Sequence, residues 1–303
     1  MLKDIQEEII KLKKEKNVAI VAHSYMPPEV LEIADVKGDS FVLSVKASQM
    51  SENTILMCGV RFMAETVKML SPQKKVVLAA PEAGCPMADQ ISPERVLAFK
   101  AEHPEFIVVA YINTTAALKS VCDICVTSSS AEQIIKKLPN KDILFIPDAN
   151  LGAYIQKSVP EKNILLWDGY CPIHAQITSE DVVKSKEKHP NAKLLVHPEC
   201  KDEVLSLADF VGSTSAIIDY AVQNDGEFII GTEKGVYDYL VQQYPEKRFY
   251  LLSKKLICPD MKITSLTDIK NALNSVGGEE IVIEEQLRIK AKKCIDAMIE
   301  LGN

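Results

Sequence analysis

A cysteine followed by proline occurs three times at nearly constant spacing, and this internal repeat constrains the fold more than any other feature. The three segments are CPMADQIS at residues 85–92, CPIHAQIT at 171–178 and CPDMKIT at 258–264, so the cysteines lie 86 and 87 residues apart. Units of about 87 residues are long enough to be small domains, and three of them fit within the 303 residues of the chain. We therefore expect three copies of one folding unit.

The repeat also relates three segments with the pattern of buried strands: IVAHSY at 20–25, VVAYIN at 108–113 and LLVHPE at 194–199. One repeat position is occupied by His23, Tyr111 and His197, and the position two residues later by Tyr25, Asn113 and Glu199. Twelve residues after the first position stand Asp35, Asp123 and Asp209, followed five residues later by Ser40, Ser128 and Thr214. Because these intervals are the same in every copy, the residues can be compared position by position.

Short apolar segments that alternate with helical patterns predict βαβ units and parallel sheets covered by helices. The predicted fold class is α/β, with three homologous sandwich-like domains in a pseudo-threefold arrangement. The expected boundaries are residues 1–89, 90–176 and 177–263, followed by a C-terminal extension over 264–303. Residues 284–301 are amphipathic, and we expect this terminal helix to pack on the first repeat.

The polar residues at the strand ends predict a binding pocket, because ligands of α/β sheets bind beyond the carboxyl ends of the strands. Positions i and i+2 of an extended segment project to the same side, so each copy can direct two polar side chains into one cavity. The hydroxyls of Ser40, Ser128 and Thr214 precede helical segments and suit phosphate or carboxylate, although a helix cap is the simpler interpretation of any single one. For the three aspartates, the identical residue and spacing favour a repeated structural hydrogen bond.

The three Cys-Pro cysteines share one repeat position, and threefold packing would bring Cys85, Cys171 and Cys258 to a common axis. Three thiolates around one point suit a 4Fe-4S cluster with one open iron site. Zinc held by three cysteines and His174 is the nearer alternative, and a repeated turn without metal is the other. The C-x-x-C pair Cys122 and Cys125 lacks cysteines at the equivalent positions and is interpreted as ordinary thiols. The same argument gives no metal role to the remaining cysteines: Cys58, Cys200 and Cys294.

The net charge of −7 offers no basic stripe for nucleic acid, which favours small-molecule partners. No apolar run is long enough to span a bilayer, and the first residues lack the uninterrupted apolar core of a signal peptide. We therefore expect a cytoplasmic protein with no membrane and no nucleic-acid partner.

The motifs along the whole chain resemble those of the quinolinate synthases. They include AHSY (22–25), AGCPMAD (83–89), YINTTAALK (111–119), PDANLG (147–152), GYCPIH (169–174), HPEC (197–200), VGSTS (211–215) and GTEKG (231–235). The resemblance implies a triangular arrangement of three α/β domains around a 4Fe-4S cluster held by Cys85, Cys171 and Cys258. The implied reaction condenses iminoaspartate with dihydroxyacetone phosphate to give quinolinate, the pyridine precursor of NAD, with release of phosphate and two waters. An L-aspartate oxidase or dehydrogenase is the implied supplier of iminoaspartate.

Site residues are also implied by the resemblance. The catalytic set is His23, Tyr25, Tyr111, His197 and Glu199. The substrate-binding set is His23, Ser40, Tyr111, Asn113, Ser128, His174, His197, Glu199, Ser213 and Thr214. Tyr25 and Glu199 are the candidates for proton transfer. One departure from the family is Met26, which stands where glutamine is usual and removes a donor and an acceptor at the pocket edge.

Two other functions share parts of this pattern. A different cluster-dependent hydro-lyase would use the same open iron on another hydroxy acid. A non-catalytic iron-sulfur or zinc protein, acting as a redox sensor or store, would need the cysteines alone. The varied histidine, tyrosine, asparagine and glutamate side chains at the strand ends argue against the second of these functions.

Overall fold

The computed structural model describes residues 2–302, which form two compact units. Unit 1 contains the residues up to Cys85 together with Cys258–Ile289, and unit 2 contains Pro86–Ile257 with the residues from Lys290 on. Among residues 2–302, no helix is both long enough and apolar enough to cross a membrane.

Unit 1 is built on one sheet and unit 2 on two, and each sheet has a core of four parallel strands. The strands of unit 1 are β1 (Val18–His23), β2 (Val36–Gly38), β3 (Thr54–Cys58) and β4 (Lys75–Leu78). The second sheet contains β5 (Ile107–Tyr111), β6 (Ile124–Val126), β7 (Asp142–Ile146) and β8 (Asn163–Leu166). The third contains β9 (Lys193–Val196), β10 (Phe210–Val211), β11 (Glu227–Gly231) and β12 (Arg248–Leu251).

All three sheets have the same strand order, in which the second strand of each copy pairs with the first, the first with the third, and the third with the fourth. The first sheet differs only by β13 (Glu279–Glu280), which adds to β4 in antiparallel orientation. The predicted α/β class with parallel sheets is therefore confirmed. The pseudo-threefold arrangement and the four segment boundaries stay predictions.

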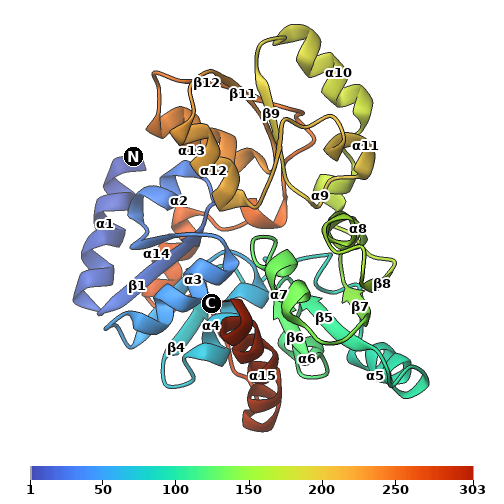
Figure 1. Cartoon of the computed structure of the whole chain (residues 1–303). Coiled ribbons are helices and arrows are strands. Elements are labelled where there is room, and N and C mark those ends of the chain that lie inside the picture. The colour runs from blue at the N-terminus through green and yellow to red at the C-terminus, as the bar shows by residue number, and fades with distance from the viewer. Residues whose placement is uncertain (1, 303) are drawn as a thin grey trace. The chain divides into compact units, whose positions relative to one another are not determined.

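Helices fill the connections between the strands, as parallel pairing requires. In unit 1 these are α1 (Leu2–Glu15), α2 (Pro28–Ile33), α3 (Ser40–Gln49), α4 (Arg61–Leu70), the 3₁₀ turn η1 (Asp260–Lys262) and α14 (Leu266–Leu273). In unit 2 they are α5 (Pro93–Glu102), α6 (Ala116–Lys119), α7 (Ala131–Lys137), α8 (Ala149–Ser158), α9 (Pro172–Ala175), α10 (Ser179–Lys188), α11 (Asp202–Leu205), α12 (Thr214–Gln223) and α13 (Lys234–Gln243). The last helix is α15 (Glu285–Gly302). Within unit 1, α14 packs beside α1 near β1, where Lys270 Nζ lies 2.8 Å from Glu8 Oε2 (Figure 1).

The repeated aspartates have the structural role predicted for them. The backbone N–H of Ile20 donates to Asp35 at 2.8 Å, that of Val108 to Asp123 at 2.8 Å, and that of Leu194 to Asp209 at 2.7 Å. In each copy a lysine of the preceding helix also contacts the carboxylate: Lys13, Lys100 and Lys186. Each aspartate therefore joins the first helix of its copy to the first strand.

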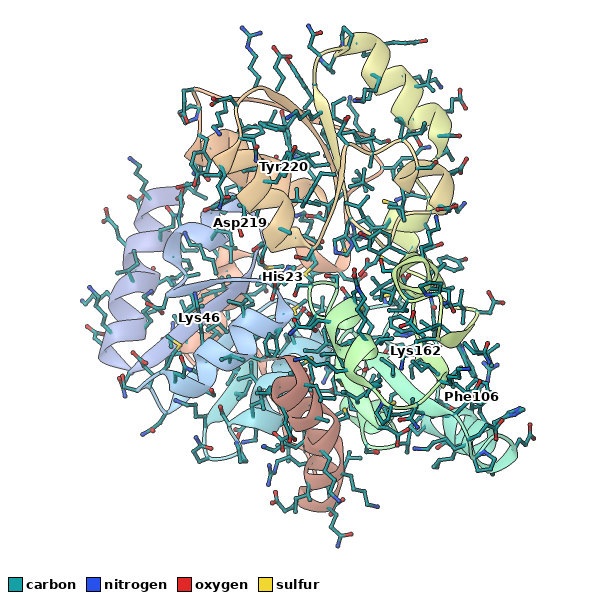
Figure 2. The ribbon with its side chains drawn as sticks, viewed as in Figure 1. His23, Lys46, Phe106, Lys162, Asp219 and Tyr220 are labelled. Carbon is teal, nitrogen blue, oxygen red and sulfur yellow. The ribbon has the colours of Figure 1, made fainter. Side chains whose placement is uncertain are left out.

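A second repeated contact involves three lysines that precede the fourth strands. Their ammonium groups donate to backbone carbonyls in the connection before the third strand, at 2.7 Å from Lys74 to Glu52, 3.0 Å from Lys162 to Asn140 (Lys162 is labelled in Figure 2) and 2.9 Å from Lys247 to Asn224. The last carbonyls of a helix and those that follow it have no partner within the helix, and a cation commonly binds them. These lysines bind such carbonyls in all three copies.

The terminal helix α15 contacts more than the first repeat, on which it was expected to pack. Near its start, the Arg288 guanidinium donates to the carbonyl of Met69 in unit 1 at 3.3 Å. Further on, Cys294 Sγ lies 2.9 Å from Cys125 Sγ, and Lys137 Nζ donates to the carbonyl of Leu301 at 2.7 Å, both within unit 2. The start of α15 therefore contacts the first repeat, as predicted, whereas its later turns contact the second repeat.

Candidate active site

Unit 2 brings several polar side chains together beyond the carboxyl ends of its parallel strands. Tyr111 ends β5, and His197 and Glu199 follow β9. His174 lies on the short helix α9, which begins directly after Cys171. His174, His197 and Glu199 are each less than 5% exposed, so their polar atoms depend on one another rather than on water.

The carboxylate of Glu199 is the centre of these contacts. Its Oε2 lies 2.7 Å from Nδ1 of His174 and 3.9 Å from Nδ1 of His197. The hydroxyl of Tyr111 also donates to this carboxylate. Three of the predicted catalytic residues and the predicted ligand-binding His174 therefore meet in one place.

Glu199 is held in its ionised form by its neighbours. Burial by itself raises the pKa of this carboxyl, but the nearby imidazoles of His197 and His174 and the hydrogen bonds from His174 and Tyr111 lower it more. The resulting pKa is about 2. At neutral pH the site therefore contains a buried carboxylate that can accept hydrogen bonds or a proton.

His174 links this carboxylate to the neighbouring cysteine. Its Nδ1 is 3.3 Å from Cys171 Sγ, its Nε2 is 3.0 Å from the hydroxyl of Thr232, and its ring stacks on His197 with the centroids 4.8 Å apart. The ligand atoms of Cys171, His174 and Glu199 all lie within 4.8 Å of one another. Thiolate, imidazole and carboxylate are common metal ligands, so this group could hold a metal ion.

Unit 1 contains the predicted residues His23, Tyr25 and Ser40. The backbone N–H of Tyr25 donates to Nδ1 of His23 at 3.1 Å, and the two rings meet edge to face. The same contact occurs in the third copy, where the N–H of Glu199 donates to Nδ1 of His197 at 3.3 Å. An Nδ1 that accepts a hydrogen bond leaves the proton of a neutral imidazole on Nε2. The repeat therefore gives both histidines the same backbone contact at Nδ1.

Met26, predicted at the pocket edge, is completely buried. Its backbone N–H donates to the carbonyl of His23 at 2.9 Å and closes the turn after β1. The thioether therefore packs in the core of unit 1, where it supports the turn that presents Tyr25.

The predicted hydroxyl residues are the first residues of helices in two copies out of three. Ser40 and Thr214 begin α3 and α12, and the side chains of Asp39 and Ser213 accept hydrogen bonds from the first turns of these helices. In the second copy α7 begins only at Ala131, and Ser128 lies in the turn before it. The helix starts later because the hydroxyls of Thr127 and Ser130 bond to each other and to this turn.

Asn113 differs from the other predicted residues in one respect. Its Oδ1 is buried, and within residues 2–302 it has no hydrogen-bond partner. An unsatisfied buried acceptor costs about 1–3 kcal/mol, so a polar group supplied by a ligand would remove a real penalty.

The cysteines fall into two groups by burial. Those of the Cys-Pro segments, Cys85, Cys171 and Cys258, are half-buried, whereas the other five are buried. Burial raises the pKa of the Cys58, Cys122 and Cys200 thiols well above their ordinary value, as expected of unreactive core residues. Cys171 lies in unit 2, while Cys85 and Cys258 lie in unit 1, so their union around one cluster stays a prediction.

Two residues of the site were not predicted: Asp148 and Thr232. Asp148 follows β7 and is fully buried. Burial and the charge of Glu199 raise its pKa to about 7, against the backbone N–H groups of Leu151 and Cys171, which lower it. Both residues lie just beyond a strand end, in the quoted motifs PDANLG and GTEKG, and this position was the signal available in the sequence.

Parallel α/β sheets with a buried ionised carboxylate, imidazoles and a phenol at the strand ends define an α/β enzyme whose site includes a group of potential metal ligands. The sequence model of the family described as "Quinolinate synthetase A protein" matches residues 7–300. The chain belongs to this family, and it is an enzyme.

Curated relatives agree with this assignment over the full length of the chain. A quinolinate synthase of Caldicellulosiruptor saccharolyticus is 50% identical over 302 residues, which cover 99% of this chain and 99% of the relative. Quinolinate synthases of Clostridioides difficile and Clostridium acetobutylicum are 46% and 47% identical, and the alignments cover 100% of this chain and 99% and 100% of the relatives.

Proposed function

We propose that the protein condenses iminoaspartate with dihydroxyacetone phosphate to give quinolinate, phosphate and two waters, as a step in the synthesis of NAD. The family and the names of the relatives support quinolinate formation. The observation that carries the proposal is the buried Glu199 carboxylate, held by His174 at 2.7 Å and by the Tyr111 hydroxyl. A group of polar side chains of this kind suits a small polar substrate and has no use in a simple metal store.

We further propose that Cys85, Cys171 and Cys258 together hold one 4Fe-4S cluster. The three thiols fit an iron-sulfur cluster, because they are half-buried and therefore accessible to iron, while the other five cysteines are buried. When bound, such a cluster supplies a Lewis-acidic iron with an open coordination position, which favours loss of hydroxide without net redox chemistry.

The proton transfers are assigned to Glu199 and Tyr25. Glu199 is ionised and can accept a proton from substrate carbon during isomerisation of the ketone and dehydration. A carboxylate with a pKa of about 2 is a weak base by itself, because the Nδ1–H of His174 at 2.7 Å and the Tyr111 hydroxyl stabilise its charge. The hydroxyl of Tyr25 donates to a leaving hydroxyl group, and His23 and His197 orient the substrate.

Anchoring of the substrate charges is assigned to the remaining residues of the site. Their hydroxyl and amide groups replace water around the carboxylates and the phosphate. Those proposed are Ser40, Asn113, Ser128, Ser213 and Thr214. The start of α12, where Ser213 and Thr214 lie, adds backbone N–H groups that favour an anion. The Oδ1 of Asn113, which has no hydrogen-bond partner among the described residues, is proposed to accept from a substrate hydroxyl or amine.

Partners and location follow from the substrates. We propose a cytoplasmic enzyme that uses small molecules and receives the unstable iminoaspartate from an L-aspartate oxidase or dehydrogenase. A lasting complex with that enzyme is not required, because transient supply is sufficient.

Anaerobic purification with a count of iron and acid-labile sulfide, followed by an assay for quinolinate, tests the proposal. We expect about four of each per chain and quinolinate from the two proposed substrates. Zinc without sulfide would refute the cluster and favour the Cys171, His174 and Glu199 group as a zinc site. A cluster without quinolinate formation would instead favour a different hydro-lyase.

A further inference from the structure

Asp148 contacts two separate parts of unit 2 with its two carboxylate oxygens. Oδ1 accepts from the backbone N–H of Leu151 at 2.8 Å and caps helix α8. Oδ2 accepts from the backbone N–H of Cys171 at 2.8 Å. A helix cap needs only the first of these bonds, so the second requires its own explanation.

The first turn of α8 also holds the segment after β9 that carries Glu199. The side-chain amide of Asn150 donates to the backbone carbonyl of Glu199 at 3.2 Å. The backbone N–H of Ala149 donates to the carbonyl of Gly169 at 2.7 Å, two residues before Cys171. Residues 148–150, the N-cap and first two residues of α8, therefore contact the Cys171 segment on one side and the Glu199 segment on the other.

Comparison of the three copies separates what the fold needs from what this site needs. The backbone bond of Ala149 has equivalents in both other copies: Arg61 N–H to Ala83 at 3.0 Å, and Lys234 N–H to Leu256 at 2.7 Å. The cap position itself is occupied by Val60, Asp148 and Glu233. Since valine serves in the first copy, the fold does not require a carboxylate at this position.

A buried carboxylate close to a second one is also unfavourable unless it is well satisfied. Asp148 is fully buried, and the charge of Glu199 acts on it. Because valine suffices at the cap position of the first copy, a carboxylate buried at this cost in the second copy is best explained by a contact other than the helix cap.

We propose that Asp148 is a positioning residue of the active site, which fixes the backbone at Cys171 and so sets Cys171 and His174 against Glu199. Helix α9 begins at the residue after Cys171, so the orientation of this peptide group determines where the His174 imidazole lies. The inference rests on the proposed function for the importance of Cys171 as a cluster ligand. The contact itself belongs to the polypeptide and can be tested without turnover.

The test uses full-length variants that separate the two carboxylate contacts. Asp148→Ser and Asp148→Asn keep a side-chain oxygen that can cap α8 but offer no second acceptor to Cys171, whereas Asp148→Ala removes both contacts. The measurement is the alkylation rate of each cysteine. Metal is first removed by a chelator, each protein is treated with iodoacetamide, and alkylation is followed by peptide mass spectrometry. Cys85 and Cys258 serve as internal controls, because they belong to unit 1. Iron and sulfide per chain are counted in parallel on anaerobically purified protein.

In the serine and asparagine variants we expect the alkylation rate of Cys171 to change by up to about tenfold, the effect of losing one hydrogen bond to a backbone N–H. The rates of Cys85 and Cys258 should be unchanged, the melting temperature should stay near that of the wild type, and iron content should fall. A wild-type alkylation rate and iron content in both variants, with defects in Asp148→Ala alone, would reduce Asp148 to a helix cap. Equal changes at all three cysteines would show general loosening and would also overturn the proposal. Absence of quinolinate formation by the wild type would refute the proposed function and leave this result standing.

Discussion

Glu199 Oε2 lies 2.7 Å from His174 Nδ1, and both side chains are less than 5% exposed. A carboxylate and an imidazole this close and this deeply buried form a strong charge-assisted hydrogen bond. The Tyr111 hydroxyl and the neighbouring His197 add to the stabilisation of the carboxylate. The charge of Glu199 is therefore a property of the whole group of side chains.

Replacement of Glu199 by glutamine is expected to abolish turnover while the absorption spectrum of the cluster stays intact. Glutamine has nearly the same shape but cannot accept a proton, and loss of a general base lowers kcat by about 10²–10⁴-fold. The measurement is quinolinate formation by anaerobically purified Glu199→Gln protein, with its spectrum recorded beside that of the wild type.

Glu203→Gln is the matched control, because Glu203 is an exposed carboxylate on α11 that contacts Ser179 at 2.8 Å. It should keep wild-type turnover. A nearly unchanged rate in Glu199→Gln would remove Glu199 from the mechanism.

Gly169→Ala is expected to disturb the Cys171 segment. A Cβ at this position would lie 2.4 Å from the carbonyl oxygen of Pro147, a backbone atom that cannot move aside cheaply. We predict loss of most of the iron and a melting temperature lowered by several degrees, since overpacking costs about 1–3 kcal/mol.

Gly84→Ala provides the comparison next to another Cys-Pro cysteine. The nearest atom to its Cβ would be Asp260 Oδ1 at 3.7 Å, an ordinary contact. Iron content and melting temperature should therefore match the wild type. Equal iron contents in the two variants would show that the close approach at Gly169 does not matter for the site.

The sequence predicted those features that the three copies share. The aspartate contacts and the parallel strands recur at fixed intervals, so a single alignment showed them. Asp148 was missed because its partner is the backbone N–H of Cys171, which lies 23 residues further along the chain and has no sequence signature. The late start of α7 after Ser128 was missed because it depends on hydroxyl contacts within one turn. Contacts specific to one copy are decided by local packing, which a repeat pattern does not report.

Cys294→Ala is expected to weaken the attachment of α15 to unit 2. The thiol is buried and lies 2.9 Å from Cys125 Sγ, so its removal leaves a small cavity between the helix and β6. We predict a loss of about 1 kcal/mol in the free energy of unfolding. Hydrogen exchange should become faster in the later turns of α15 than in α8. Lys293→Ala, at the exposed neighbouring position, should leave both quantities unchanged, and identical exchange in the two variants would contradict the prediction.

Asp209→Asn tests the repeated aspartate contact through its pH dependence. Burial by itself raises the pKa of Asp209, but the hydrogen bonds from Lys186 and from the N–H of Leu194 lower it more, so the pKa lies below its ordinary value. A carboxyl whose pKa is depressed in the folded state stabilises the protein above its unfolded pKa of about 3.9, and this contribution is lost as the pH falls through the folded value. The wild type should therefore exceed the variant by about 1 kcal/mol at pH 7, a modest value because the ion pair is partly exposed.

Denaturant unfolding between pH 7 and pH 2 measures this difference, which should shrink below about pH 4, as the pH falls through the folded pKa. Asp219 is the control, since it is an exposed residue of α12 (Figure 2). Asp219→Asn should track the wild type at every pH. A stability difference for Asp209→Asn that is constant over this range would mean that the carboxylate stabilises the protein by its hydrogen-bond geometry and packing rather than by its charge. The Lys–Asp pairs of the other two copies would then need the same reinterpretation, because they make the same bonds to Ile20 and Val108.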